Sequence, residues 1–139
     1  MKILSTHTQI SPHTAGAVYR LWSEPDSWMQ WDPDVTEVRF AGEPVEGARG
    51  WMRPASGPAT TFEIVAMRHD RLLTTVSRMP GAALSFEHAV EPTRGGSRMT
   101  VKISVDGPLS ALWGSVLRRG FADAASRNIA GLVAYLDAA

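Results

Sequence analysis

The last quarter of the chain, residues 108–139, reads PLSALWGSVLRRGFADAASRNIAGLVAYLDAA. Its large apolar residues recur every three or four positions, which is typical of an amphipathic helix. The polar residues Arg119, Asp123, Ser126 and Asp137 fall on the other side of that helix. The pattern predicts one long helix whose inward positions are Leu109, Leu112, Trp113, Val116, Leu117, Phe121, Ala124, Leu132, Tyr135 and Leu136.

The inward side of this helix also carries small and polar residues, namely Gly120, Asn128 and Gly131. A glycine inside a helix costs about 1 kcal/mol relative to alanine, so we interpret the two glycines as making space. We therefore expect a cavity beneath the helix, of a kind that binds an apolar molecule.

Strand patterns fill most of the chain before this helix. In residues 84–90, for example, Leu84, Phe86, His88 and Val90 alternate with polar or small residues. Ser11 and Pro12 predict the start of a short helix that ends near Glu24. Short turns separate the strands, which favours an antiparallel sheet, and residues 42–58 are the most loop-like. The expected strands are 2–10, 35–40, 47–53, 60–67, 72–78, 84–90 and 99–105.

This order of elements predicts an α+β fold in a single domain covering residues 1–139. The 14 basic and 14 acidic residues balance, so no strong field would attract nucleic acid or an anionic membrane. The chain has no cysteine, and its four histidines show no metal-ligand spacing, so we expect neither a metal nor another cofactor. No segment resembles a signal peptide or a membrane span, so we expect a cytoplasmic location. We expect the protein to be a monomer or a homodimer.

Several short motifs follow one another along almost the whole chain. They are Trp31-Asp32-Pro33, Gly47-Ala48-Arg49-Gly50, Phe86-Glu87-His88, Gly96–Val101, Asp106–Leu109 and, late in the last helix, Asn128 with Leu132. Taken in this order, they resemble the START-like (SRPBCC) superfamily with its helix-grip fold, in the branch similar to polyketide cyclases and dehydrases. The resemblance implies a curved antiparallel sheet wrapped around a long C-terminal helix, with a cavity between them for a hydrophobic small molecule.

His88 is the best candidate for an acid or base, because the alternation of its strand turns it inward. The alternative is a core histidine bonded to a backbone carbonyl or to Asn128. Asn128 lies on the apolar side of the last helix, where its amide would hold either a ligand oxygen or a neighbouring element.

Aromatic residues supply the other candidate contacts. Trp28 and Trp31 would either line an entrance or plug the core, and Trp51 is a candidate lid residue. Tyr135 is expected at the rim of the cavity. Four arginines lie in predicted strands: Arg49, Arg53, Arg68 and Arg78. Either one of them points inward as a cation for an acidic ligand, or all four point outward into solvent. The full predicted ligand-binding set is Trp28, Trp31, Trp51, Phe62, Phe86, His88, Val101, Trp113, Leu117 and Asn128.

These observations favour a protein that binds a lipid, polyketide or aromatic metabolite without changing it. The alternative is a metal-free cyclase, dehydratase or isomerase in which His88 acts as acid and base and Asn128 holds a carbonyl oxygen. A third interpretation is an interaction module with an unused cavity. A membrane-inserted protein and a nucleic-acid partner are not expected.

Overall fold

The computed structural model describes all 139 residues. Seven antiparallel strands form one sheet in the order β1-β7-β6-β5-β4-β3-β2, so β1 and β2 are its edges. The strands are β1 (Lys2–Ser11), β2 (Val35–Arg39), β3 (Arg49–Pro54), β4 (Thr60–Arg68), β5 (Leu72–Met79), β6 (Ala82–Thr93) and β7 (Gly96–Asp106). The helices are α1 (Ala15–Ser23), the short 3-10 turn η1 (Pro25–Ser27), α2 (Trp28–Trp31), α3 (Ser110–Phe121) and α4 (Ala124–Ala138).

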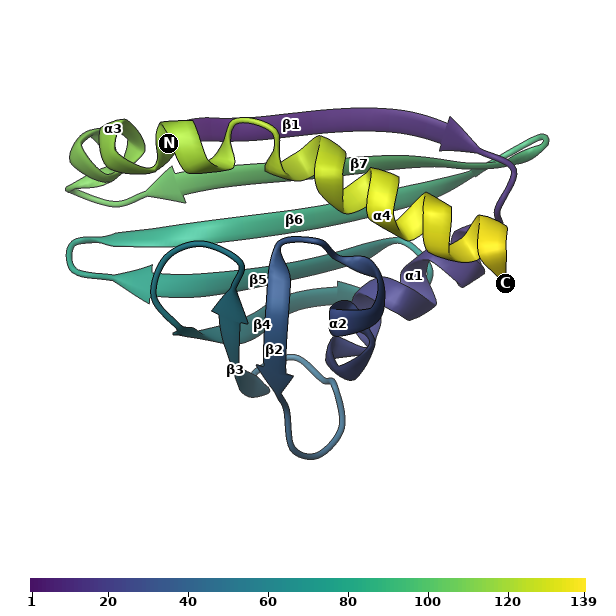
Figure 1. The fold of residues 1–139 in the computed structure, drawn as a ribbon, viewed down its shortest axis with the longest axis horizontal. Helices are drawn as coiled ribbons and strands as arrows, with labels where there is room; N and C mark the ends of the chain where they lie inside the picture. Colours follow the sequence, from purple (N-terminus) through teal and green to yellow (C-terminus); the bar gives the residue numbers. More distant parts are fainter.

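The predicted α+β class and all seven predicted strands are confirmed. Consecutive strands from β2 to β7 are neighbours, as short connections require, and β1 closes the far edge by pairing with β7. Figure 1 shows the helices lying across the sheet, with α1 and α2 gathered near the C-terminal end of α4. The helices cover one side of the sheet, and we call that side the inner face.

The C-terminal segment is two helices, so the prediction of a single long helix is wrong. A turn at Ala122 and Asp123 interrupts the helix, and the backbone leaves helical dihedral angles at Asp123. Ser5 of β1 holds this break from both sides: its Oγ donates to the Ala122 carbonyl at 3.1 Å and accepts from the Ala125 amide at 3.1 Å. Ser5 thus provides hydrogen-bond partners for a carbonyl at the end of α3 and an amide at the start of α4, which have no partner within their own helices.

The first helix begins later than the sequence predicted. Its N-cap is Thr14, whose hydroxyl accepts from the amide of Ala17 at 3.1 Å. Ser11 is buried, and its hydroxyl oxygen instead accepts a hydrogen bond from the amide of His13. Three residues, Pro12, His13 and Thr14, therefore separate β1 from α1.

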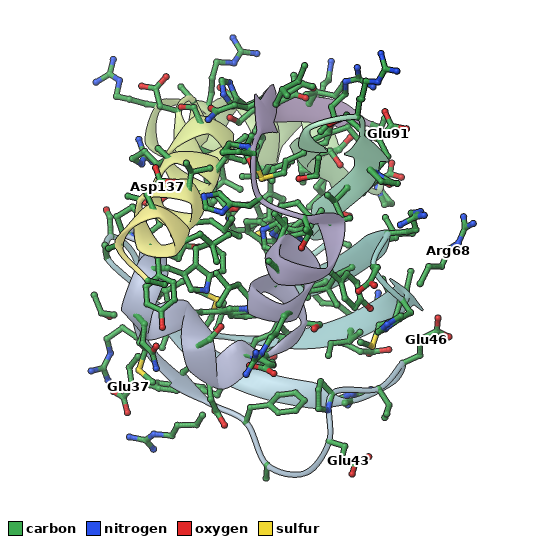
Figure 2. The ribbon with its side chains drawn as sticks, turned by 90° about the vertical axis from the view of Figure 1, so that its right-hand side faces the viewer. Glu37, Glu43, Glu46, Arg68, Glu91 and Asp137 are labelled. Carbon is green, nitrogen blue, oxygen red and sulfur yellow. The ribbon has the colours of Figure 1, made fainter.

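The two C-terminal helices bury their inner sides to different degrees. In α4, the side chains of Ala125, Ile129 and Leu132 are fully buried. In α3, by contrast, the only buried residue is Gly114. The molecule is consequently well packed beneath α4, whereas α3 covers the sheet with few buried contacts. Charged side chains labelled in Figure 2, such as Arg68 and Glu91, extend outward from the ribbon.

None of the helices combines the length and apolar character needed to cross a lipid bilayer.

Candidate functional site

The half-buried region between α3 and the inner face of the sheet is the candidate site. Phe86 of β6 pairs across the sheet with Ile103 and Thr75, both buried, which places its ring on the inner face. Its ring centroid lies 6.1 Å from that of Phe121 on α3. Both phenylalanines are only half-buried, although they face each other inside the fold. The half-buried side chains that surround this space include Met79, Trp113 and Leu117.

Two hydroxyls on β5 face the same space and were missed in the sequence. Thr75 is paired with Phe86, and Ser77 is paired with Leu84, so both share the inner face. They are only 4% and 3% exposed, respectively. The run Leu72–Met79 does not alternate clearly between apolar and polar residues, so only the strand register shows which of its hydroxyls point inward.

His88 lies deeper, at the border of the filled core. Its Nδ1 is 3.1 Å from the carbonyl oxygen of Leu73, and its ring centroid is 5.2 Å from that of Trp22. Burial lowers the pKa of His88 to about 4, so the imidazole is neutral at pH 7. This geometry matches the core-histidine alternative, while an acid–base role for His88 stays a prediction.

Asn128 joins two other helical segments through its amide. Its Oδ1 accepts from the indole Nε1 of Trp22 at 3.2 Å, and its Nδ2 donates to Oδ2 of Asp32 at 3.3 Å. Burial raises the pKa of Asp32 to about 6, against the opposing hydrogen bonds from Asp34 and Asn128. Both ends of the Asn128 amide are therefore occupied by the protein, and a role in holding a ligand carbonyl stays a prediction.

Trp28 and Trp31 are buried beside β2 and α4. The indole of Trp28 donates to the Trp22 carbonyl at 3.0 Å and lies 5.0 Å from Phe62, while the indole of Trp31 donates to Ser27 at 3.1 Å. Phe62 and Val101, also in the predicted set, are buried. These contacts match the interpretation of the two tryptophans as a plug of the core.

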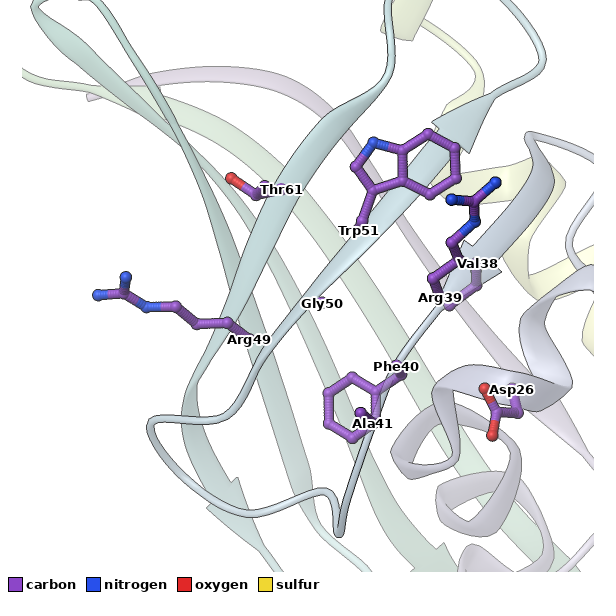
Figure 3. Close-up of a pocket in the computed structure, with 9 residues that line it drawn as sticks. All are labelled: Asp26, Val38, Arg39, Phe40, Ala41, Arg49, Gly50, Trp51 and Thr61. Atoms are coloured by element: carbon purple, nitrogen blue, oxygen red, sulfur yellow. The ribbon is translucent and has the colours of Figure 1, made fainter.

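Trp51 lies in β3, the predicted strand inside the loop-like stretch 42–58, on the side of the sheet away from the helices. Its neighbour Gly50 pairs with buried Phe62, whereas Trp51 itself pairs with exposed Thr61. The guanidinium carbons of Arg39 and Arg53 lie 4.7 and 5.3 Å from the centroid of its ring. Trp51 lines an open surface pocket of about 700 Å³ (Figure 3), which also includes Phe40, Arg49 and Asp26.

The glycines of the C-terminal segment do not make the space that the sequence suggested. A Cβ on Gly131 would lie 2.1 Å from the carbonyl oxygen of Trp31, so this glycine permits close contact between α4 and α2. A Cβ on Gly120 would meet nothing within 4 Å. The half-buried state of the sheet under α3 therefore follows from how little of α3 is buried, and not from these glycines.

The remaining candidates lie at the surface. The hydroxyl of Tyr135 donates to Gln30 at 2.9 Å, and the residue is 37% exposed, as expected for the rim. The four strand arginines that offered a possible inward cation, Arg49, Arg53, Arg68 and Arg78, are all exposed.

Residues 2–137 match the family described as polyketide cyclase / dehydrase and lipid transport. The chain belongs to this family. The match confirms the resemblance to the START-like superfamily and spans nearly the full length of the protein. No curated protein matches the chain significantly.

Solved structures agree with this family membership at the level of the fold. A protein from Mesorhizobium loti, MLL2253, is 16% identical, with a TM-score of 0.70 and 96% of each chain covered. Ara h 8.0201 is 13% identical, with a TM-score of 0.69 over 96% of this chain and 97% of the other. DynU16, from the dynemicin biosynthetic locus, is 15% identical, with a TM-score of 0.67 over 96% of this chain and 46% of its own.

Proposed function

We propose that this family member binds a hydrophobic small molecule between α3 and the inner face of the sheet. The observation that carries the proposal is the half-buried pair Phe86 and Phe121, whose rings face each other within the fold. Large apolar side chains turned inward gain free energy when a ligand covers them, by about 25 cal/mol per Å². The family description, which includes lipid transport, supports a ligand of this kind.

The contrast with α4 indicates where the ligand would bind. Beneath α4, fully buried side chains and the bonded group Trp22, Asn128 and Asp32 leave no half-buried aromatic pair facing inward. The proposed site therefore uses Phe86, Trp113 and Leu117 of the predicted set. The cyclase or dehydratase alternative would need Asn128 to exchange its present partners for a substrate and would need that substrate to reach the buried His88.

The test uses two adjacent threonines on β5 that face opposite ways. Thr75→Phe would fill the proposed space, whereas Thr74→Phe places the same side chain on the outer face, where Thr74 pairs with Glu87. We expect the wild type to bind the neutral fluorescent probe N-phenyl-1-naphthylamine saturably. We expect Thr75→Phe to weaken binding about tenfold or more and Thr74→Phe to leave it unchanged.

Circular dichroism and thermal unfolding would establish that both variants fold. Leu117→Trp fills the same space from α3 and provides an independent block if Thr75→Phe unfolds. Equal probe binding by the blocked and control variants, or no saturable binding by the wild type, would overturn the proposal.

A further inference from the structure

The inner hydroxyls of β5 lack partners within the protein. Thr75 and Ser77 are more than nine-tenths buried, yet neither hydroxyl makes a hydrogen bond to another group of the chain. No fully buried side-chain oxygen or nitrogen of this protein is without a partner. The two hydroxyl oxygens therefore retain a small contact with solvent. A ligand that displaces this solvent has to replace its hydrogen bonds.

The wall around these hydroxyls is formed by β5, β6 and β7, and none of its inner positions carries a charged side chain. The inner positions of β5, β6 and β7 are apolar except for Thr75, Ser77, His88 and Ser97. His88 bonds to the Leu73 carbonyl, and the Ser97 hydroxyl donates to the His13 carbonyl at 2.8 Å, so only the two β5 hydroxyls are left without a partner. On α3, Arg118 and Arg119 are exposed, while Trp113, Leu117 and Phe121 turn inward. Lys2, at the sheet edge, packs its stem beside Gly114 and is exposed to solvent.

An anionic ligand would find no cation beside Thr75 and Ser77, because Lys2 lies on β1, which β7 and β6 separate from β5. A carboxylate moved from water into such a space loses its hydration without gaining a counter-ion, which opposes binding. Hydroxyl side chains, in contrast, both donate and accept hydrogen bonds, so they suit a neutral alcohol, phenol or ketone. Two of them on one strand, at alternate positions, can bind two oxygens or orient one.

We propose that the ligand is an uncharged, oxygen-bearing hydrophobic molecule whose hydroxyl or carbonyl group bonds to Thr75 and Ser77, and that fatty acids and other anions are disfavoured. This inference rests on the proposed function, because it assigns the chemistry of the same site.

Competition against bound N-phenyl-1-naphthylamine at pH 7.5 tests the inference with three probes of one shape: 2-naphthol, 2-naphthoate and 2-methylnaphthalene. We expect the wild type to bind 2-naphthol at least tenfold more tightly than 2-naphthoate. In the double variant Thr75→Val, Ser77→Ala, we expect 2-naphthol to weaken about fivefold or more, while 2-methylnaphthalene binds at least as tightly as before.

The matched control is Thr74→Val, which makes the same change on the outer face and should alter no affinity. Naphthoate binding as tight as naphthol binding, or an unchanged naphthol affinity in the double variant, would overturn the assignment of a neutral ligand while leaving the binding function standing. Absence of saturable N-phenyl-1-naphthylamine binding by the wild type would instead remove the proposed function itself.

Discussion

Asp32 and His88 change protonation in opposite directions when the protein folds. Burial raises the pKa of Asp32 from 3.8 to about 6 and lowers that of His88 from 6.5 to about 4. Between pH 6 and pH 4 the folded protein holds a proton on Asp32 that the unfolded chain releases, so acid stabilises the fold there. Over the same range the unfolded chain holds a proton on His88 that the folded protein excludes, so acid destabilises the fold.

The two effects are each worth about 1.4 kcal/mol per pH unit and oppose one another. We expect Asp32→Asn to lose stability relative to the wild type as the pH falls from 6 to 4, because only the His88 penalty remains. We expect His88→Gln to gain stability relative to the wild type over that range. Urea unfolding at several pH values measures both differences, and parallel curves for the two variants would contradict this account.

Gly120 and Gly131 form a second pair of contrasting residues. We expect Gly131→Ala to lower the free energy of unfolding by about 1–3 kcal/mol, because its Cβ would overlap the Trp31 carbonyl. Gly120→Ala meets open space and removes a flexible residue from α3, so it should raise stability by up to about 1 kcal/mol. Chemical denaturation of the two variants gives the comparison, and an unchanged or raised free energy of unfolding in Gly131→Ala would show that the contact at Gly131 is unimportant.

At the scale of elements, α3 and α4 differ in how firmly they are held. The start of α3 is tied to the turn between β5 and β6, where the Trp113 indole donates to the Pro80 carbonyl at 2.8 Å and the Leu109 amide donates to Gly81 at 2.9 Å. Its end is tied through Ser5. Between these points only Gly114 is buried, so few apolar contacts oppose local opening of α3.

We expect the amides of α3 to exchange with deuterium at least tenfold faster than those of α4. Ser5→Ala, which removes both bonds at the break, should increase exchange in α3, whereas Thr8→Ala on the exposed side of β1 should not. Hydrogen-exchange mass spectrometry with N-phenyl-1-naphthylamine should then show slower exchange in α3. Equal protection of the two helices in the free protein would contradict the description of α3 as a loose cover.

At the scale of the whole molecule, one sheet supports two regions of different density. The region beneath α4 is closed by α1, α2 and the bonded side chains of Trp22, Asn128 and Asp32. The region beneath α3 has half-buried aromatic residues and two solvated hydroxyls. A rigid, filled half can thus hold the sheet in shape while the other half admits a ligand, which is the arrangement that the proposed function requires.

The strands and turns of this fold could be predicted from short stretches of the sequence. Alternation in segments such as 84–90 and turn residues such as Pro80-Gly81 predicted the strands correctly, because the period of a strand and the geometry of a turn depend on near neighbours. The inward direction of His88 and Phe86 followed from the same alternation. The family resemblance added the order of elements over the whole chain.

The sequence alone therefore determined the class of fold, the strands and the inward side of β6. Tertiary contacts determined the rest: Ser5 divides the C-terminal helix from 117 residues away, the Trp31 carbonyl requires Gly131, and the register of β5 turns Thr75 inward. These contacts cannot be predicted from the residues next to them in the sequence, because each contact joins atoms that only folding brings together. The candidate site lies where those distant contacts leave α3 loosely seated, so its position became visible only in the folded protein.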